Sequence, residues 1–283
     1  MKNNMDDSLE FLGHNEVGNR LYRCPHCHDI IEVGSDVFYG RCPACKLTII
    51  DYKPAPHQEA FHRSNAKFKL NIGGFGSGKT TMNCAEISRH ALTTPRGKTL
   101  ITAPTLKLVK DAVLPELNKF LPIWLLKRPP IITPTPYYIL KNGHEIIVYA
   151  SNDEENLRSL NLSAFYIEEA SNVDHKIFVQ LQSRLRNIAA VDFDENGNQV
   201  RDRFMGLVST NPEDCWVRDE ILLKSDKIYT SASIDRTVYE KLRVKSPIKE
   251  YASFLSSSRD NAYLPRNYIR DLVAGKSPSW VKL

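Results

Sequence analysis

The chain has 283 residues, of which 42% are hydrophobic, so it can bury the core of one large domain and one small one. No apolar run approaches the length of about 18 residues that a membrane span needs, and the start, MKNNMDDSLE, lacks the apolar region of a signal peptide. We therefore expect an intracellular protein without a membrane partner, and the net charge of +5 permits an anionic partner without establishing one.

Four of the six cysteines lie in two CxxC pairs near the N-terminus. The pairs Cys24–Cys27 and Cys42–Cys45 have nearly the spacing of a four-cysteine zinc ribbon, and the surrounding segments, RLYRCPHCHDIIEV and VFYGRCPACKLTII, predict two short hairpins. Four thiolates would enclose Zn²⁺ in a closed tetrahedron, which predicts a structural role. Two disulfides are the alternative, which an intracellular setting disfavours. The two histidines beside the first pair are alternative ligands, although solvent exposure suits them better.

Beyond Pro54 and Pro56, which suit a linker, strands and helices alternate. We expect a strand near 67–73, a helix near 78–92, a strand at 98–103 and a helix across 106–120. This alternation is typical of an α/β fold with a mostly parallel sheet flanked by helices.

The segment YYILKNGHEIIVYA interrupts the alternation and predicts a hairpin that turns at Asn142-Gly143. A second hairpin is predicted at DFDENG, which begins at Asp192 and turns at Asn196-Gly197. Its resemblance to a calcium loop fails because Arg203 stands where a bidentate Glu is needed. The remaining predicted elements are strands at 163–170 and 204–210, a helix near 174–188 and a last helix after Pro265.

The segment GGFGSGKTT matches the P-loop pattern, with a predicted strand before it and a predicted helix after it. Its backbone N–H groups would surround the phosphates of ATP at the N-terminus of the helix, where the helix dipole favours anions. Lys79 would reach the β- and γ-phosphates, and the Thr80 hydroxyl would hold Mg²⁺. An ordinary glycine-rich turn is the alternative. The expected nucleotide-binding residues are Gly73, Gly74, Phe75, Gly76, Ser77, Gly78, Lys79, Thr80 and Thr81.

The predicted strand AFYI ends in the acidic pair Glu168-Glu169. A P-loop enzyme needs a carboxylate on the metal side and a base for the attacking water, so we expect Glu168 to contribute to the magnesium site and Glu169 to activate the water. An acidic pair at the start of a helix is the alternative. Arg158 lies in a polar segment before this strand, and Arg184 and Arg186 lie on the predicted helix after it; a solvated face is the default for all three. For Arg158, the position beside the expected nucleotide site also suggests an arginine that stabilises charge during phosphoryl transfer.

Residues 55–283 resemble the large terminase subunit of tailed bacteriophages, the motor that packages DNA into procapsids. The segments that carry the resemblance are PHQEAFHRS, GGFGSGKTT, NLRSLNLSAFYIEEAS, QLQSRLR, LVSTNP and DNAYLPRNYIRDL. It implies a RecA/ASCE-like P-loop ATPase core at 55–213, after a zinc-ribbon segment with an N-terminal extension at 1–54. Residues 214–283 would be a lid subdomain and a linker toward a nuclease domain, which is either cut off or encoded separately, so we expect no nuclease activity from this chain alone.

The resemblance also implies roles for single residues. Gln58 is similar to the glutamine that senses adenine, Glu168 to the metal-side acid and Glu169 to the catalytic acid. Ser209, Thr210 and Asn211 resemble the coupling motif that senses the γ-phosphate. Arg158 lies where the family places an arginine that acts on the nucleotide of a neighbouring subunit. Two departures are Glu168, where Asp is more usual, and the ribbon, which is not part of the common family core.

As a terminase subunit, the protein would hydrolyse ATP and translocate double-stranded DNA through the portal protein. It would form a homo-oligomeric ring, work with a small terminase subunit, and be docked on the procapsid in the host cytoplasm. A helicase-like DNA-dependent ATPase is the alternative enzyme, but the residues after 211 are too few for a second RecA-like domain. A zinc-ribbon nucleic-acid-binding protein with a vestigial P-loop is the alternative outside enzymes, and the intact P-loop and acidic pair argue against it.

Overall fold

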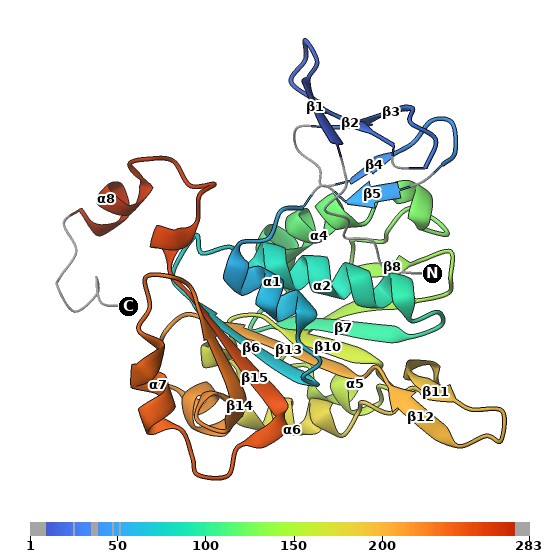
Figure 1. The fold of residues 1–283 in the computed structure, drawn as a ribbon. Helices are drawn as coiled ribbons and strands as arrows, with labels where there is room; N and C mark the ends of the chain where they lie inside the picture. The colour runs from blue at the N-terminus through green and yellow to red at the C-terminus, as the bar shows by residue number, and fades with distance from the viewer. Residues whose placement is uncertain (1–9, 25, 35–38, 47, 51, 275–283) are drawn as a thin grey trace.

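The computed structural model describes residues 10–24, 26–34, 39–46, 48–50 and 52–274. Figure 1 shows a small N-terminal unit, in dark blue, above one end of a sheet that has helices on both of its faces. Within the described residues, no helix is long and apolar enough to span a membrane.

The described residues of the N-terminal unit form five short antiparallel strands. They are β1 (Glu10–His14), β2 (Arg20–Arg23), β3 (Ile30–Val33), β4 (Tyr39–Arg41) and β5 (Thr48–Ile50). The pairs β2–β3 and β4–β5 confirm the two predicted hairpins, whereas β1, which pairs with β2, was not predicted. Among the side chains that the structure describes in this unit, Tyr22, Ile31, Val33, Cys24 and Cys42 form a buried cluster. Small units of this kind commonly rely on a metal or a disulfide as well as on their core.

The large sheet has eight strands in the order β14-β15-β6-β13-β10-β7-β9-β8. Neighbouring strands run parallel except at the edge, where β8 pairs antiparallel with β9. In chain order these strands are β6 (Phe68–Gly73), β7 (Lys98–Ala103), β8 (Tyr137–Ile139), β9 (Glu145–Ala150), β10 (Ala164–Ile167), β13 (Met205–Thr210), β14 (Ser225–Thr230) and β15 (Ile248–Ser256). The mostly parallel α/β sheet expected from the sequence is therefore confirmed.

Helices cover both faces of this sheet. Figure 1 shows α1, α2 and α4 on one face and α5 and α6 on the other. The α-helices are α1 (Pro56–Arg63), α2 (Lys79–Thr93), α3 (Leu106–Leu108), α4 (Leu114–Phe120), α5 (Glu154–Arg158), α6 (His175–Gln182), α7 (Arg236–Leu242) and α8 (Tyr268–Val273). A π-turn, η1 (Val109–Val113), joins α3 to α4, so residues 106–120 form the continuous helix that was predicted.

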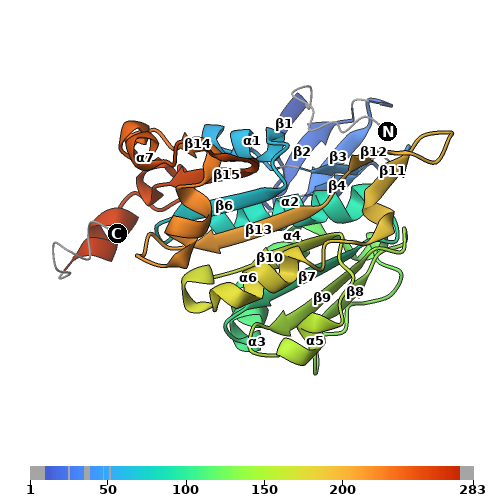
Figure 2. The same cartoon turned by 90° about the horizontal axis from the view of Figure 1, so that it is seen from below.

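Short helical turns and one separate hairpin complete the fold. The turns are η2 (Ile123–Leu125), η3 (Ala170–Asn172), η4 (Ile188–Ala190), η5 (Arg218–Leu222) and η6 (Ser258–Asp260). The hairpin of β11 (Val191–Phe193) and β12 (Gln199–Asp202) turns at the predicted position, with Gly197 at φ 80°. In Figure 2 this hairpin projects from the side of the molecule.

Two apolar layers hold the helices against the sheet. On one face, Met82, Ile87, Leu114 and Leu117 pack with the strands; on the other, Phe178 of α6 is among the buried residues. The central strands β6, β10 and β13 are buried along their whole length, as expected for parallel strands that are covered on both sides. Their carboxyl ends meet at one edge of the sheet, which is where ligands bind in folds of this kind.

A buried ionic cluster fixes α1 and α2 to β6. The carboxylate of Glu86 is completely buried and accepts hydrogen bonds from Lys69 Nζ at 2.8 Å and from Arg89 Nη2 at 2.5 Å, and it lies 2.8 Å from His62 Nδ1. Lys69 Nζ also donates to the carbonyl of Phe61 at 2.9 Å. The cluster therefore joins the end of α1, the strand before the P-loop and the helix after it.

One predicted helix is shorter than expected. Instead of continuing to 188, α6 ends at Gln182, so Arg184 and Arg186 do not lie on it. The backbone N–H of Leu162 donates to the carbonyl of Arg184 at 2.8 Å, and the N–H of Arg186 donates to Leu162 at 3.1 Å. Pairing with the segment before β10 thus replaces the last helical turns.

Three further elements beside β6 were not predicted. The structure adds α1 before β6, and it adds β14 and β15 beside β6. β14 and β15 come from the segment 214–283 and belong to the same sheet as the core strands, so this segment lies beside the carboxyl end of β6. The expected domain boundary at residue 213 stays a prediction.

Candidate functional site

The P-loop connects the end of β6 at Gly73 to the start of α2 at Lys79. Gly76 and Gly78 have φ angles of 73° and 87°, which residues with a side chain adopt only under strain. The first N–H groups of α2 lack partners within the helix and carry its positive dipole end. Ser77 Oγ is buried without a hydrogen-bond partner among the described residues. The loop therefore has the backbone of a phosphate cradle.

Lys79 lies inside this cradle. Its Nζ donates to the carbonyls of Gly73 at 2.5 Å and Gly74 at 3.2 Å, and to Oδ1 of Asn211 at 3.2 Å. Burial lowers the pKa of Lys79, and the neighbouring carboxylates of Glu168 and Glu169 oppose that shift. The structure thus brings the predicted lysine and asparagine together, although 132 residues separate them in the chain.

Glu168 follows β10 and is buried beside the cradle. Thr80 Oγ1 donates to it at 3.0 Å, and the hydroxyls of Tyr166 and Ser209 donate to its other oxygen. The hydroxyl oxygens of Tyr166 and Ser209 are also 3.1 Å apart. Three hydroxyls therefore hold this carboxylate in one orientation.

Tyr166 was not predicted to be a site residue. Side chains two positions apart on a strand lie on the same face, so the alternation of β10 places Tyr166 on the face from which Glu168 continues. The two-residue periodicity of this strand is the sequence signal from which Tyr166 could have been predicted to lie beside Glu168. Ser209 was predicted as part of the coupling motif, and its hydrogen bond to Glu168 links that motif to the acidic pair.

Glu169 is half-buried and has φ 50°, in the left-handed region that few residues other than glycine adopt. Burial raises its pKa, and the negative charges of Glu168 and Glu213 raise it further, while Lys79 acts in the opposite direction. Strained backbone of this kind is common at active sites. A carboxylate with a raised pKa is a better proton acceptor, which suits a general base.

The oxygen atoms of Thr80 and Glu168 fit a magnesium ion. A hydroxyl and a carboxylate are hard oxygen ligands, which Mg²⁺ prefers, and Mg²⁺ sites in proteins commonly use one or two carboxylates together with the phosphates of a nucleotide. The hydrogen bond between the two residues places both groups beside the N-terminus of α2.

Gln58 is buried on α1 and lies next to the loop: a Cβ atom at Gly78 would be 2.8 Å from its Nε2. Its Oε1 accepts the N–H of Ala55 at 2.8 Å, so the same side chain also caps α1.

The hydroxyls of two other predicted residues, both threonines, contact protein groups. Thr81 donates to Glu116 at 2.8 Å, and Thr210 accepts the N–H of Ser171 at 3.3 Å.

Arg158 lies on α5, away from the P-loop. Its Nη2 donates to Glu154 at 3.1 Å, and Glu154 also pairs with Lys176 at 2.8 Å. The preceding strand, β9, is separated from β10 by β7 in the sheet. Within the described part of the chain, no hydrogen bond connects Arg158 to the P-loop, so this structure does not bring Arg158 to the site.

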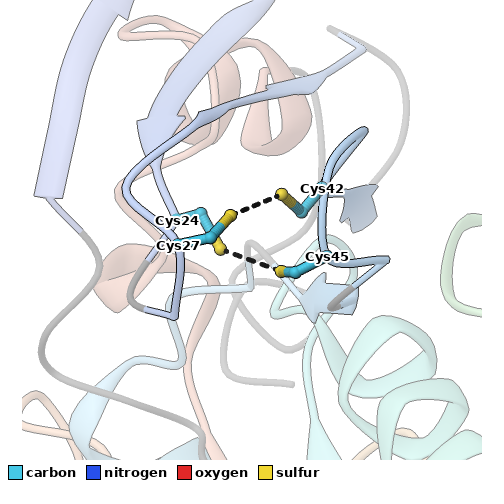
Figure 3. Close-up of side chains that lie close together, drawn as sticks. All are labelled: Cys24, Cys27, Cys42 and Cys45. Carbon is cyan, nitrogen blue, oxygen red and sulfur yellow. Dashed lines mark hydrogen bonds between the residues drawn. The ribbon is translucent and has the colours of Figure 1, made fainter.

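The four cysteines converge from the turns of two hairpins, as Figure 3 shows. Their sulfur atoms all lie within 4.8 Å of one another. The Cys24–Cys45 and Cys27–Cys42 sulfur separations are 3.5 and 3.3 Å, well beyond the disulfide length of about 2.05 Å. A tetrahedral zinc site with Zn–S bonds of about 2.3 Å places its sulfurs about 3.8 Å apart. The cluster therefore fits a closed zinc site.

Solved structures of two phage large terminases have a similar fold. The large terminase from the thermophilic bacteriophage D6E aligns over 81% of this chain and 52% of its own, with 12% identity and a TM-score of 0.59. The structure of the D6E protein in complex with ATP-gamma-S aligns over 81% of this chain and 51% of its own, with 12% identity and a TM-score of 0.58. The ATPase domain of the Thermus phage P74-26 large terminase aligns over 82% of this chain and 92% of its own, with 18% identity and a TM-score of 0.55. The chain spans about half the length of the D6E protein, and at these identities the likeness shows the fold alone.

The sequence itself matches a family model. The model for phage terminase large subunit covers residues 65–278, which include the P-loop and the acidic pair and exclude the four cysteines. None of the curated proteins compared matches the chain. The family match covers well over half of the sequence and confirms the resemblance inferred from the motifs. The chain therefore belongs to the phage terminase large subunit family.

Proposed function

We propose that this protein is the ATPase of a viral DNA-packaging motor, which hydrolyses ATP to move double-stranded DNA into a procapsid. The observation that carries the proposal is the convergence of Lys79, Thr80, Glu168 and Asn211 on one phosphate-binding loop. Family membership supports the packaging role, and a D6E large terminase of the same fold has been solved with ATP-gamma-S.

The phosphates of ATP bind between the P-loop N–H groups and Lys79. On binding, the Lys79 ammonium exchanges the loop carbonyls of Gly73 and Gly74 for phosphate oxygens. Thr80 and Glu168 hold Mg²⁺, which neutralises charge on the phosphates when it is bound. Because Tyr166 and Ser209 also donate to Glu168, the carboxylate keeps its orientation while Thr80 turns toward the ligand.

Glu169 accepts a proton from the attacking water. Its raised pKa and its position directly after Glu168 support this role. Asn211, which contacts Lys79, detects whether the γ-phosphate is present. Since Ser209 of the same segment binds Glu168, loss of that phosphate moves β13 and the chain that follows it.

The motor acts as a homo-oligomeric ring at the portal protein, in the host cytoplasm and docked on the procapsid. Arg158 then completes the site of a neighbouring subunit. Its exposure and its position on α5 support this, since it is available to a partner. A small terminase subunit and a nuclease, either a further domain or a separate chain, complete the machinery. Residues 55–213 are the ATPase core and 214–283 the lid subdomain and linker.

The four-cysteine cluster is a structural zinc site. Four thiolates leave no open coordination position, so the ion supports folding and takes no part in hydrolysis. The ribbon packs against the ATPase core, where the guanidinium of Arg41 lies 4.6 Å from the centre of the Trp124 ring.

The deciding experiment measures ATP hydrolysis with Mg²⁺, with and without double-stranded DNA, at several protein concentrations. We expect turnover that DNA stimulates and that rises more than linearly with protein concentration. Lys79→Ala should abolish it, while Lys227→Ala, which changes an exposed lysine on β14, should not. Wild-type protein without ATPase activity, or a fully active Lys79→Ala variant, would refute the proposal.

A further inference from the structure

The segment DNAYLPRNYIRDL contributed to the family resemblance but has no role in the mechanism above. It begins just after β15, whose last residue, Ser256, pairs in register with Gly73 at the end of β6. Residues 256–268, which we call the strap, run from the last residue of β15 to the first residue of α8. The strap therefore starts beside the P-loop, far from it in sequence but adjacent in the sheet.

Two strap side chains donate hydrogen bonds to P-loop carbonyls. Ser258 Oγ donates to the carbonyl of Phe75 at 2.5 Å, and Asn261 Nδ2 donates to the carbonyl of Gly76 at 2.6 Å. The carbonyls of Gly73 and Gly74 accept from Lys79, whereas those of Phe75 and Gly76 accept from the strap. The strap therefore contacts two consecutive carbonyls of the loop that Lys79 does not reach.

The strap also occupies the space that the P-loop glycines leave. A Cβ atom at Gly73 would overlap Ser256, one at Gly74 would lie 2.9 Å from Ser258 Oγ, and one at Gly76 would lie 2.9 Å from the hydroxyl of Tyr268. All three glycines are therefore required for close packing with the strap, and Gly76 is also required for its φ of 73°.

Further hydrogen bonds anchor the strap elsewhere. Asp260 accepts from the N–H and hydroxyl of Ser233, at 3.1 and 2.6 Å. The hydroxyl of Tyr263 donates to the carbonyl of Lys53 in the linker at 3.3 Å. Asn261 Oδ1 accepts the N–H of Tyr263 at 3.0 Å, which fixes the asparagine side chain while its Nδ2 reaches Gly76.

We propose that Ser258 and Asn261 are positioning residues that hold the P-loop in its phosphate-binding conformation. They act through the loop carbonyls and touch no phosphate themselves. The inference rests on the proposed function, because it assumes that the loop binds the phosphates of a nucleotide. It predicts that losing either donor weakens binding of any phosphate chain equally, whatever base it carries.

The test measures Kd for Mg-ATP, Mg-GTP and Mg-pyrophosphate by calorimetry, and kcat and KM for ATP, in four variants. Asn261→Asp keeps the acceptor for Tyr263 and loses the donor to Gly76, and Asn261→Leu removes the donor without adding charge. Ser258→Ala removes the other donor. Tyr263→Phe is the matched control, since it removes a strap hydrogen bond that does not reach the P-loop.

One hydrogen bond of this kind corresponds to about a fivefold change in affinity. We expect Asn261→Leu and Ser258→Ala each to raise all three Kd values about fivefold, and to raise KM for ATP with little change in kcat. Asn261→Asp should raise them more, because a carboxylate then faces a carbonyl. Tyr263→Phe should leave them unchanged.

The outcomes separate this inference from the proposed function. If the donor variants are folded by circular dichroism and bind pyrophosphate as tightly as the wild type, or if they weaken ATP but not pyrophosphate, the positioning role is wrong. If the wild type binds pyrophosphate and the variants bind it more weakly, but no ATP is hydrolysed, the proposed function fails and the positioning role stands. A wild type that binds none of the three ligands refutes both.

Discussion

Replacing Glu169 by Gln removes the general base and keeps the size of the side chain. General bases contribute about 10²–10⁴-fold to rates, so kcat should fall by that factor. ATP binding should persist, because Lys79 and the loop are unchanged and one negative charge near the phosphates is lost. Steady-state ATPase assays and calorimetry measure the two effects. Wild-type kcat in the variant would show that the base lies elsewhere.

The pH dependence tests the same assignment more sharply. The base must be deprotonated, so kcat should rise with pH through the pKa of Glu169, which burial and the charges of Glu168 and Glu213 raise above the usual glutamate range. Glu213→Gln removes one of those charges, lowers the pKa and should shift the acid limb to lower pH. Glu195→Gln, on the exposed β11–β12 hairpin, is the matched control. Equal profiles for the two variants would contradict the argument.

Three further predictions concern folding and assembly. A chelator should unfold the segment that holds the four cysteines and leave the eight-stranded sheet intact by hydrogen exchange, whereas freshly purified reduced protein without zinc would refute the metal site. Arg158→Ala and Lys79→Ala chains, each inactive alone, should hydrolyse ATP when they are mixed. If the two chains assemble together but the mixture stays inactive, Arg158 does not act on a neighbouring subunit. Glu86→Gln should reduce the free energy of unfolding by about 3–5 kcal/mol, because Lys69 loses its buried counter-ion; an unchanged denaturation midpoint would contradict this.

Local sequence patterns predicted those helices, strands and turns whose own residues are enough to indicate their conformation. The P-loop follows a wholly buried strand and precedes a long helix, so periodicity and glycines sufficed. Strand β15 was missed because only its second half is buried, and β14 because its buried residues are few and do not follow an alternating pattern. Their pairing with β6 depends on contacts between distant parts of the chain, which no local pattern contains.

The same distinction holds within the site. Tyr166 was predictable in principle, because it lies two residues before Glu168 on one strand. Ser258 and Asn261 were not, since they lie 183 and 185 residues from the carbonyls that they bind, and serine and asparagine are ordinary loop residues. The pairing of β15 with β6 brings the start of their segment beside the P-loop.

The contrast between two ion pairs supports the proposed role of Arg158 in a neighbouring subunit. The Lys69–Glu86 pair is buried, so separating it would leave an uncompensated charge, and the elements it joins stay fixed. The Arg158–Glu154 pair is exposed, and Glu154 retains Lys176 as a second partner. Exposed ion pairs contribute little to stability, so Arg158 can leave Glu154 at small cost. Arg158 can therefore break its ion pair and bind the nucleotide of a neighbouring subunit, whereas a side chain in a buried ion pair such as Lys69–Glu86 cannot.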